Sequence, residues 1–413
     1  MTSRREFIKK STVSFVGASV ISKNLIADAS NNQENFWDDI RNQFPLRDHR
    51  VYFNNGTIGP SPTPVLEAVK SKMDELNAIG EYRGQEDSRE PVANFIGALP
   101  EEISLTHNTT EGINIVASGL PLKKGDEVIM TSHEHAGNAL PWLNQIKNRG
   151  IVIKVVDPAD SAEENLNRIN DRFTERTRVV AVPHITCTTG LTYPIKEISS
   201  LAHDKGAWMF CDGAHAPGSM AIDMKELGCD FYASCGHKWL LGPSGTGFLY
   251  VNSNVLEDLT PFAIGAYSDT GWTISDINQV IDGFVPTAHR FDYGTQSAPL
   301  ANGLKAAVTF LSDIRIEKVE TYISGLSDHL YKELSKIDQI EVLSPNEERS
   351  RSSMIAFKIN TMDYREFGKL VAKEFRIRMV PESNLNAIRI STHIYNNKLQ
   401  IDNFIDKIHS VID

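Results

Sequence analysis

Two ionisable side chains, Asp212 and Lys238, stand in sequence contexts that favour chemistry over a surface role. Asp212 follows an apolar run in Phe210-Cys-Asp-Gly-Ala-His-Ala-Pro-Gly218, so its carboxylate is expected at the carboxyl end of a buried strand. Lys238 stands 26 positions later, in Cys235-Gly-His-Lys-Trp-Leu-Leu-Gly, among neighbours unlike those of a solvated lysine. Taken alone, Asp212 would more often be a helix N-cap. Together, an amine that can hold an aldehyde and an acid that can protonate a pyridine ring suit reactions at an amino acid α-carbon.

Two upstream segments contain side chains that could complete such a site. Thr106-His-Asn-Thr-Thr-Glu-Gly112 is a hydroxyl-rich turn that leads into a helical pattern, an arrangement that presents backbone N–H groups to a phosphate. His135 follows the apolar run 128–130, where an imidazole can stack on a cofactor ring. His133 and His135 could also suit a metal, but no third ligand has a suitable spacing, so we expect no metal site. The set indicates pyridoxal 5′-phosphate (PLP) as the cofactor.

These segments resemble the class V aminotransferases among the fold-type I PLP enzymes, and most of all their isopenicillin N epimerase-like branch. The likeness runs from Tyr52-Phe-Asn-Asn-Gly-Thr57 to Arg389-Ile-Ser-Thr-His-Ile-Tyr395. It implies that Lys238 forms the Schiff base with PLP and that Asp212 pairs with the pyridine nitrogen. The other cofactor contacts that it implies are His135 on the ring, Thr109, Thr110 and His237 at the phosphate, and His215 beside the ring oxygen.

The resemblance also assigns a subunit contact and a substrate contact. Thr295, in Arg290-Phe-Asp-Tyr-Gly-Thr-Gln296, matches the residue that reaches the phosphate of the partner subunit, so we expect a homodimer with a shared active site. Arg389 matches the arginine that clamps the α-carboxylate of a small amino-acid-type substrate, a task that suits its bidentate fork. Asn54 lies in the N-terminal segment that approaches the site in relatives, and we expect it to contact substrate or cofactor.

The chain departs from this family pattern at several cysteines. Cysteine desulfurases of the group carry a catalytic cysteine in a loop before the carboxylate arginine, whereas the stretch 375–386 contains none, so we do not expect a persulfide mechanism. Cys187, in His184-Ile-Thr-Cys-Thr-Thr-Gly190, replaces a frequent asparagine near the ring hydroxyl. Cys235 replaces a frequent phosphate-binding serine, and whether Ser234 or Cys235 contacts phosphate stays open.

Three functions remain compatible with these residues. The main expectation is an aminotransferase or epimerase that acts at the α-carbon of an amino acid or amino-acid-containing metabolite through Lys238. The alternative is a PLP-dependent carbon–sulfur lyase on a cysteine conjugate, which needs no loop cysteine. The non-enzymatic alternative is a degenerate PLP fold that serves as a binding module.

Apolar runs alternate with helical patterns through the middle of the chain, which predicts a large α/β domain of the fold-type I PLP-dependent transferase kind, with a mostly parallel central sheet. The expected strands lie at 127–130, 151–156, 178–182, 207–210 and 247–251. One long helix over 304–334, a strand over 354–358 and a closing helix over 400–411 then indicate a smaller α+β domain. We expect four parts: a signal peptide over 1–29, an N-terminal segment over 30–60 that packs with the small domain, a large PLP-binding domain over 61–290 and a small domain over 291–413.

The first residues have the layout of a twin-arginine signal. Arg4-Arg5 precede Phe7-Ile8-Lys9, a weakly apolar stretch and the small residues Ala27-x-Ala29. Lys23 and Asn24 interrupt the apolar stretch, so it is a poor membrane span, and we expect none in the mature form. An amphipathic N-terminal helix with an accidental arginine pair is the alternative. Because the twin-arginine export machinery carries folded proteins, the signal predicts a periplasmic or otherwise exported enzyme that is loaded with cofactor before export.

Charge and cysteine content limit the possible partners. The formal net charge of -11 provides no basic surface for nucleic acid, so we expect no nucleic-acid partner. The 4 cysteines have no CxxC spacing, and we expect free thiols and no disulfide framework.

Overall fold

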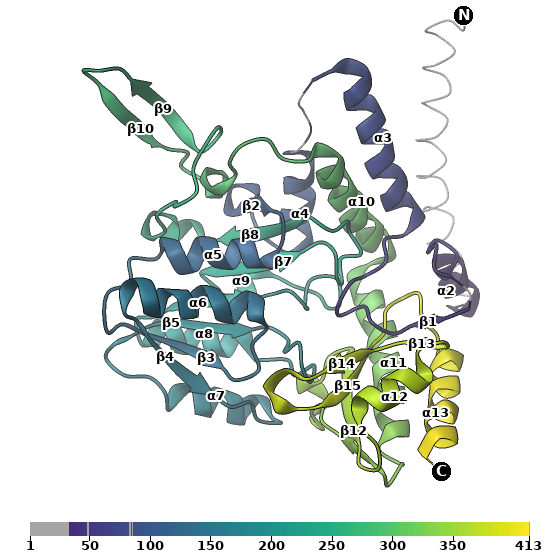
Figure 1. The fold of residues 1–413 in the computed structure, drawn as a ribbon. Helices are drawn as coiled ribbons and strands as arrows, with labels where there is room; N and C mark the ends of the chain where they lie inside the picture. Colours follow the sequence, from purple (N-terminus) through teal and green to yellow (C-terminus); the bar gives the residue numbers. More distant parts are fainter. Residues whose placement is uncertain (1–32, 48, 82–83, 85, 413) are drawn as a thin grey trace, which may run out of the picture.

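The computed structural model describes residues 33–47, 49–81, 84 and 86–412 (Figure 1). The predicted signal peptide over 1–29 lies outside these residues, so it stays a prediction. Within the described ranges, no helix has both the length and the apolar character that crossing a lipid bilayer requires.

A seven-stranded sheet forms the centre of the large domain. Its strands follow the order β2-β8-β7-β6-β5-β3-β4, and β3 to β7 run parallel, while β8 is antiparallel to both of its neighbours. This confirms the mostly parallel α/β architecture. The strands are β2 (Ile103–Thr106), β3 (Glu127–Thr131), β4 (Val152–Val156), β5 (Thr177–Pro183), β6 (Trp208–Asp212), β7 (Phe231–Cys235) and β8 (Gly247–Val251).

Helices cover both faces of this sheet, which explains why its strands are apolar throughout. One face packs against α5 (Thr109–Gly119) and α6 (Ala136–Arg149), which contribute Ile113, Val116 and Trp142 to its core. The other face packs against α4 (Arg89–Phe95), α7 (Ala162–Asn170), α8 (Ile195–Asp204) and α10 (Ala298–Ile314). Two further helices of this part are α3 (Thr63–Ile79), which packs against α10, and α9 (Met224–Leu227).

A smaller antiparallel sheet forms the second domain, with the strand order β11-β12-β15-β14. Its helices α11 and α13 bury Leu330 and Phe404 in a separate core. The elements are β11 (Ile340–Val342), β12 (Met354–Ile359), β14 (Arg378–Val380), β15 (Ala387–Ser391), α11 (Ile316–Leu334), α12 (Tyr364–Val371) and α13 (Lys398–Ile412).

The expectation of one long helix over 304–334 is wrong, because two helices meet at Arg315. This residue has a φ of 78°, a left-handed backbone value that interrupts α10 and starts α11. Val319 and Ile323 of α11 still belong to the core of the large domain, whereas Leu326 belongs to that of the small domain. The two cores therefore adjoin within α11. The expected domain boundary at residue 291 stays a prediction.

The N-terminal segment joins the small domain through backbone pairing. After α2 (Gln33–Arg41), strand β1 (Val51–Tyr52) runs parallel to β13 (Phe375–Arg376), and Asn54 forms a bridge with Ser391. This segment then turns back to the large domain, where the Gly59 N–H donates to the His237 carbonyl at 2.7 Å. A β-carbon at Gly59 would lie 1.9 Å from the Lys238 carbonyl oxygen, so only glycine fits there.

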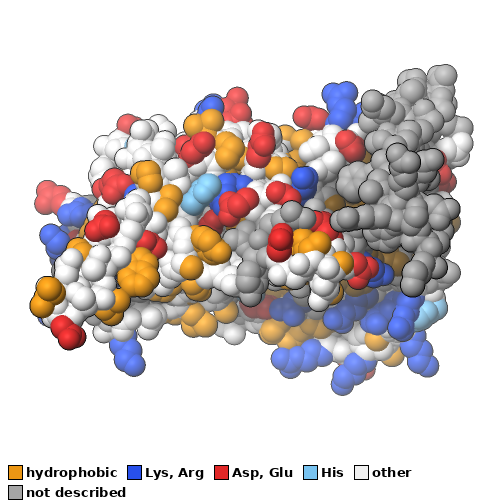
Figure 2. Space-filling model, turned by 90° about the horizontal axis from the view of Figure 1, so that it is seen from above, with side chains coloured by type: hydrophobic (Ala, Val, Ile, Leu, Met, Phe, Trp, Pro, Cys, Tyr) orange, Lys and Arg blue, Asp and Glu red, His pale blue; other side chains and the backbone are white. Residues whose placement is uncertain are grey.

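One hairpin projects from the body of the molecule (Figure 1). It consists of β9 (Asp269–Ile274) and β10 (Gln279–Phe284), and we call it the β9–β10 arm. The arm exposes large apolar side chains, with Trp272 64% and Ile277 98% exposed. Apolar side chains also show on this end of the molecule in the space-filling view (Figure 2).

The remaining short 3-10 helices are Glu86–Ser88, Pro100–Glu102, Ser253–Asp258, Ala288–Phe291, Glu348–Ser350 and Glu382–Asn384.

Candidate active site

Asp212 is the last residue of β6, at the carboxyl end of the parallel strands, as predicted. Its Oδ1 accepts a hydrogen bond from the Ala214 N–H at 2.9 Å. Burial raises the pKa of its carboxyl group, while the nearby Lys238 cation and that N–H oppose the rise. The next residue must be Gly213, since a β-carbon there would lie 1.8 Å from the Tyr232 ring.

Lys238 lies in the loop that follows β7, the strand next to β6 in the sheet. Its Nζ is 3.1 Å from Nε2 of His215. The other ring nitrogen of His215, Nδ1, accepts a hydrogen bond from the indole N–H of Trp239 at 3.1 Å. Burial lowers the pKa of His215 well below its ordinary value, and the Lys238 cation lowers it further. We call Asp212, His215, Lys238 and Trp239 the cofactor floor.

His135 is the residue before α6 and is exposed. Its Nδ1 accepts the Gly137 N–H at 3.0 Å, so the neutral ring carries its hydrogen on Nε2. Partial burial lowers the pKa of His135, and the Lys238 cation adds to this effect. The neighbouring Glu134 fixes the same turn, because its carboxylate accepts hydrogen bonds from Thr131 and Asn138.

Two buried polar atoms, one on Thr109 at the start of α5 and one on His237 in the loop after β7, suit contacts with a phosphate. Thr109 Oγ1 and His237 Nδ1 are both buried without a hydrogen-bond partner among the described residues. Burial, together with Lys238, lowers the pKa of His237 to about 4. Thr110 follows Thr109 in the first helical turn and is exposed. Buried polar atoms without partners are costly in a protein interior, so this pair favours a polar ligand here.

The two candidates left open for phosphate contact differ in their partners. The Ser234 hydroxyl donates to the Gly213 carbonyl at 2.9 Å, so its proton is already engaged. The Cys235 thiol is 3.9 Å from the Ala214 carbonyl oxygen and is also buried.

Arg389 is buried on β15, where the small domain meets the site. Its guanidinium donates to the Cys187 carbonyl and, at 3.3 Å, to the Thr57 hydroxyl. Its Nε has no partner in the part of the chain that the structure describes. Burial lowers the pKa of Arg389 to about 10, so it remains a cation at neutral pH. This is the property that a carboxylate clamp requires.

Asn54 reaches Arg389 only through an intermediate residue. Its Oδ1 accepts the Thr57 hydroxyl at 2.8 Å, and Thr57 in turn accepts from Arg389. The structure therefore brings Asn54 to the rim of the site as a support for the arginine. Thr57 was not singled out from the sequence, although a threonine directly after Asn54-Asn55-Gly56 was the available signal.

Cys187 contacts Arg389 through its carbonyl oxygen and lies within electrostatic reach of Lys238. All four cysteines lie within the described ranges and are free thiols. Cys187 is half-buried, whereas Cys211, Cys229 and Cys235 are buried. Burial raises the pKa of its thiol to about 11, against the opposing influence of the Arg389 and Lys238 cations. The thiol is therefore protonated at neutral pH and is a poor nucleophile in this environment.

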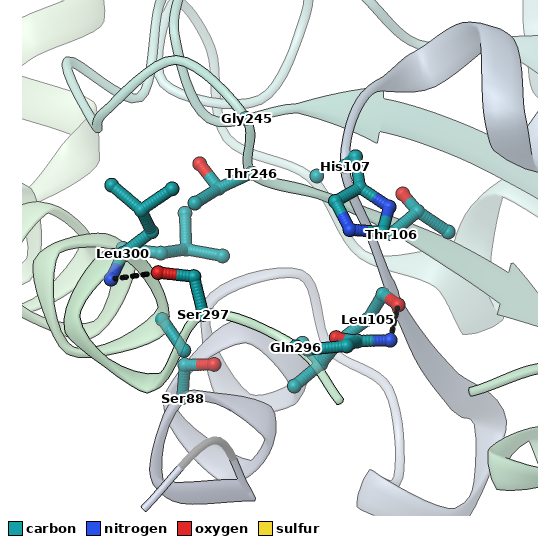
Figure 3. Close-up of a pocket in the computed structure, with 12 residues that line it drawn as sticks. Ser88, Leu105, Thr106, His107, Gly245, Thr246, Gln296, Ser297 and Leu300 are labelled. Atoms are coloured by element: carbon teal, nitrogen blue, oxygen red, sulfur yellow. Dashed lines mark hydrogen bonds between the residues drawn. The ribbon is translucent and has the colours of Figure 1, made fainter. Parts of the chain in front are cut away.

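Thr295 is not brought to this cluster. It is exposed in the loop before α10, and no hydrogen bond among the described residues joins it to the cofactor floor. The neighbouring Gln296 and Ser297 line a small cleft together with Thr106 and Gly245 (Figure 3). Its volume of about 20 Å³ suits roughly one water molecule and is too small for a cofactor.

The residues fit PLP as a resident cofactor. Asp212 provides a buried acid for a pyridine nitrogen, Lys238 an amine for an aldehyde, and Thr109 and His237 donor groups for a phosphate. Among the described residues, no group of three or more histidines, cysteines or acidic residues could hold a metal ion.

Comparison with known proteins gives a consistent result. The sequence profile of the "Aminotransferase class-V" family matches residues 66–404. A "Probable cysteine desulfurase" of Methanothermobacter thermautotrophicus is 36% identical over 347 residues, which are 81% of this chain and 84% of that protein. Another protein of that name, from Synechocystis sp., is 30% identical over 407 residues, covering 90% of this chain and 95% of the relative.

Solved structures show the same fold. The apo structure of a cysteine desulfurase from Thermococcus onnurineus superposes with a TM-score of 0.83 at 26% identity, covering 91% of this chain and 98% of that one. The cystine C–S lyase C-DES, solved in complex with its reaction product cysteine persulfide, superposes with a TM-score of 0.81 at 24% identity, covering 89% and 99%. The relatives named here are cysteine desulfurases and a C–S lyase, whereas the sequence was expected to lie nearest to the epimerase-like branch.

Proposed function

We propose, from the premise that this chain belongs to the class-V aminotransferase family and uses PLP, that it is a carbon–sulfur lyase acting on a cysteine-type amino acid. One observation carries the proposal. Arg389 holds a buried, positively charged guanidinium with a free N–H beside Cys187 and within electrostatic reach of the cofactor floor. This arrangement supports the binding of an α-carboxylate by Arg389 while Lys238 acts at the α-carbon.

The reaction divides among a few side chains. Bound PLP supplies an electron sink for charge that develops at the substrate α-carbon. Arg389 binds the α-carboxylate and orients the substrate, and the Lys238 amine takes the α-proton. Asp212 holds a proton at the pyridine nitrogen. The neutral His135 ring offers its Nε2–H as a donor.

Sulfur is expected to leave with a product instead of staying on the protein. The stretch 375–386 has no cysteine to accept it, and the Cys187 thiol is held in its protonated form. Breakage of the Cβ–S bond of a cysteine-type substrate, with a proton added to the leaving sulfur and one water molecule consumed, would then give a sulfur-containing product, pyruvate and ammonia. The names of the relatives support cleavage of a carbon–sulfur bond over the transamination or epimerisation that was the main expectation from the sequence.

Product analysis tests the proposal. The purified protein is given cysteine, cystine and cysteine conjugates, with Lys238→Ala as the control, and pyruvate, ammonia, keto acid and α-hydrogen exchange are measured separately. We expect the wild type to release equal amounts of pyruvate and ammonia, and Lys238→Ala to release neither. A keto acid that retains the substrate's side chain would indicate transamination, and exchange without products would indicate epimerisation; either result would overturn the proposal. A persulfide on Cys187 would overturn the release of sulfur.

We also propose a homodimer in which Thr295 completes the partner's phosphate site. Two observations support it: Thr295 is exposed and away from its own cofactor floor, and the adjacent β9–β10 arm exposes Trp272 and Ile277. The Gly294 N–H donates to the Ala266 carbonyl at 3.0 Å, which ties the Thr295 loop to the base of the arm. Apolar area of this kind is typical of subunit interfaces.

Export through the twin-arginine machinery is a separate proposal that rests on the sequence alone. Replacement of Arg4 and Arg5 by lysine should retain the protein inside the cell, because the paired arginines are the recognised feature. Cell fractionation of wild type and variant measures this. An unchanged distribution between the compartments would contradict it.

A further inference from the structure

Three side chains form a hydrogen-bonded chain that ends at the reactive lysine. The Trp239 indole nitrogen is 3.1 Å from His215 Nδ1, and His215 Nε2 is 3.1 Å from Lys238 Nζ. Trp239 and His215 are 1% and 3% exposed, so water does not compete for these contacts. Trp239 is itself fixed, because His393 Nε2 lies 3.1 Å from its carbonyl oxygen.

The indole N–H decides the direction of both hydrogen bonds. An indole nitrogen can only donate, so Nδ1 of His215 must accept and cannot carry a hydrogen. A neutral imidazole has one hydrogen, which must then be on Nε2. Nε2 therefore points an N–H at Lys238 and cannot accept from it. Only the uncharged amine, which has a free lone pair, can accept that hydrogen bond.

We propose that Trp239 is a positioning residue that fixes His215 as an Nε2–H donor toward the reactive lysine and its cofactor. This deepens the proposed function at the same site, but its readouts do not depend on which substrate is cleaved. The donor favours the uncharged amine, which is the form that attacks an aldehyde. Once PLP is bound, the same N–H suits a negatively charged oxygen or an uncharged nitrogen at this position.

The surroundings of His215 support a neutral ring. Burial is the largest influence that lowers its pKa, and the titratable groups that face it from other elements lower it further when they carry a positive charge. These neighbours are Lys238 and His237 in the loop after β7, Arg389 on β15 and His135 before α6. A second proton on the ring would also meet the Trp239 N–H head-on. The geometry and the electrostatics thus agree.

The first test reads the tautomer directly. Holoenzyme labelled with ¹⁵N-histidine is examined by long-range ¹H–¹⁵N correlation, and His215→Gln identifies the signals of His215. We expect an Nε2–H, Nδ1-acceptor pattern in the wild type. Trp239→Phe should lose this fixed pattern. A wild-type ring with its hydrogen on Nδ1, or a doubly protonated ring, would overturn the proposal, and this outcome does not require Trp239→Phe to fold.

The second test uses a double-mutant cycle with a conservative rescue. The pH at which the visible band of the lysine-bound cofactor changes is measured for wild type, Trp239→Phe, His215→Gln and the double variant. Loss of the donor should raise this midpoint by about one unit in Trp239→Phe. Glutamine can donate from its amide whatever its neighbour does, so Trp239→Phe should cause no further shift in the His215→Gln background.

A purely structural role for Trp239 gives a different pattern. It would shift the midpoint equally in both backgrounds, or lower the unfolding temperature without moving the midpoint in either, and both outcomes would overturn the proposal. The spectrum and the NMR signals need only bound PLP. If the protein lacks lyase activity but shows the expected tautomer and the expected double-mutant result, the proposed substrate class is wrong and the role of Trp239 is retained.

Discussion

The cofactor floor and the β9–β10 arm differ in how far a single chain completes them. In the floor, Asp212, His215 and Trp239 are buried. Asp212 accepts a hydrogen bond from a backbone N–H, and His215 accepts one from the Trp239 indole. In the arm, Trp272 and Ile277 face outward, and Thr295 at its base is exposed. The floor has the character of a protein interior, whereas the arm exposes apolar area of the kind that subunit interfaces bury. The residues that suit the chemistry and those that suit the proposed assembly therefore lie in separate segments of the chain.

The largest expected effect comes from variants that separate Lys238 and Thr295 onto different chains of the proposed dimer. Thr295→Glu should lower activity by about 100-fold, because a carboxylate would repel the partner's phosphate. Lys238→Ala should be inactive. The two inactive variants are dissociated and mixed in equal amounts, so that about half of the dimers are mixed. Each mixed dimer has one intact site of two, so about one quarter of the wild-type activity should return.

Activity is measured on each variant and on the mixture. Thr295→Ser, which keeps the hydroxyl, is the matched control and should stay close to wild type. No recovery on mixing, with dimers formed, would show that Thr295 does not serve the partner's site.

Replacement of Arg389 tests whether this residue binds the substrate without affecting the bound cofactor. Arg389→Lys keeps the charge but loses the bidentate fork, so KM should rise by about 10- to 100-fold. The visible spectrum of bound PLP should stay unchanged, because the arginine acts on the substrate. Steady-state kinetics and absorbance measure the two effects. A loss of kcat with constant KM would place Arg389 in another role.

Polar substitution of the arm should weaken assembly more than folding. In Trp272→Ser/Ile277→Ser, the free energy of unfolding of one chain should change by no more than about 0.5 kcal/mol, since both side chains are exposed. Sedimentation should show a larger dimer dissociation constant. Leu399→Ser removes a similarly exposed apolar side chain, 65% exposed, from α13 and should leave the dimer intact.

The smallest expected effect concerns Glu134, beside the ring-stacking candidate His135. Burial raises the pKa of Glu134 from an ordinary 4.5 to about 7, despite hydrogen bonds from Asn138 and Thr131. Between these values the folded protein binds more protons than the unfolded chain, so stability should fall as pH rises from about 4.5 to 7. Glu134→Gln should flatten this part of the stability profile. Denaturant unfolding at several pH values measures the slope, and an unchanged slope would contradict the assignment.

Asp212 of the cofactor floor could be predicted from the sequence because the end of an apolar run indicates the end of a buried strand, and Lys238 because its neighbours are unlike those of a solvated lysine. Asp212 terminates an apolar run, and the structure places it at the end of β6 next to the Lys238 loop. Spacing along the chain cannot give the orientation of a ring. The contact between Trp239 and His215 depends on how two loops cross, so it was not foreseen.

The missed elements have physical reasons of the same kind. Arg315 adopts its left-handed backbone without a glycine or proline to indicate the break in the helix. Strand β7 was overlooked because its residues 231–235 run directly into the Lys238 motif. Thr57 connects Asn54 to Arg389 across 332 positions of the chain, and no local pattern reports such a contact.

The N-terminal segment has a consequence for when the site can form during synthesis. Its Gly56 N–H is bonded to Ser391 Oγ, a partner 335 residues later in the chain. At ribosomal speeds of about 5–20 residues per second, this partner emerges on the order of tens of seconds after the segment itself. Until then Arg389, two residues before Ser391, is also absent. A nascent chain therefore cannot form these contacts around the candidate site until residue 391 has left the ribosome.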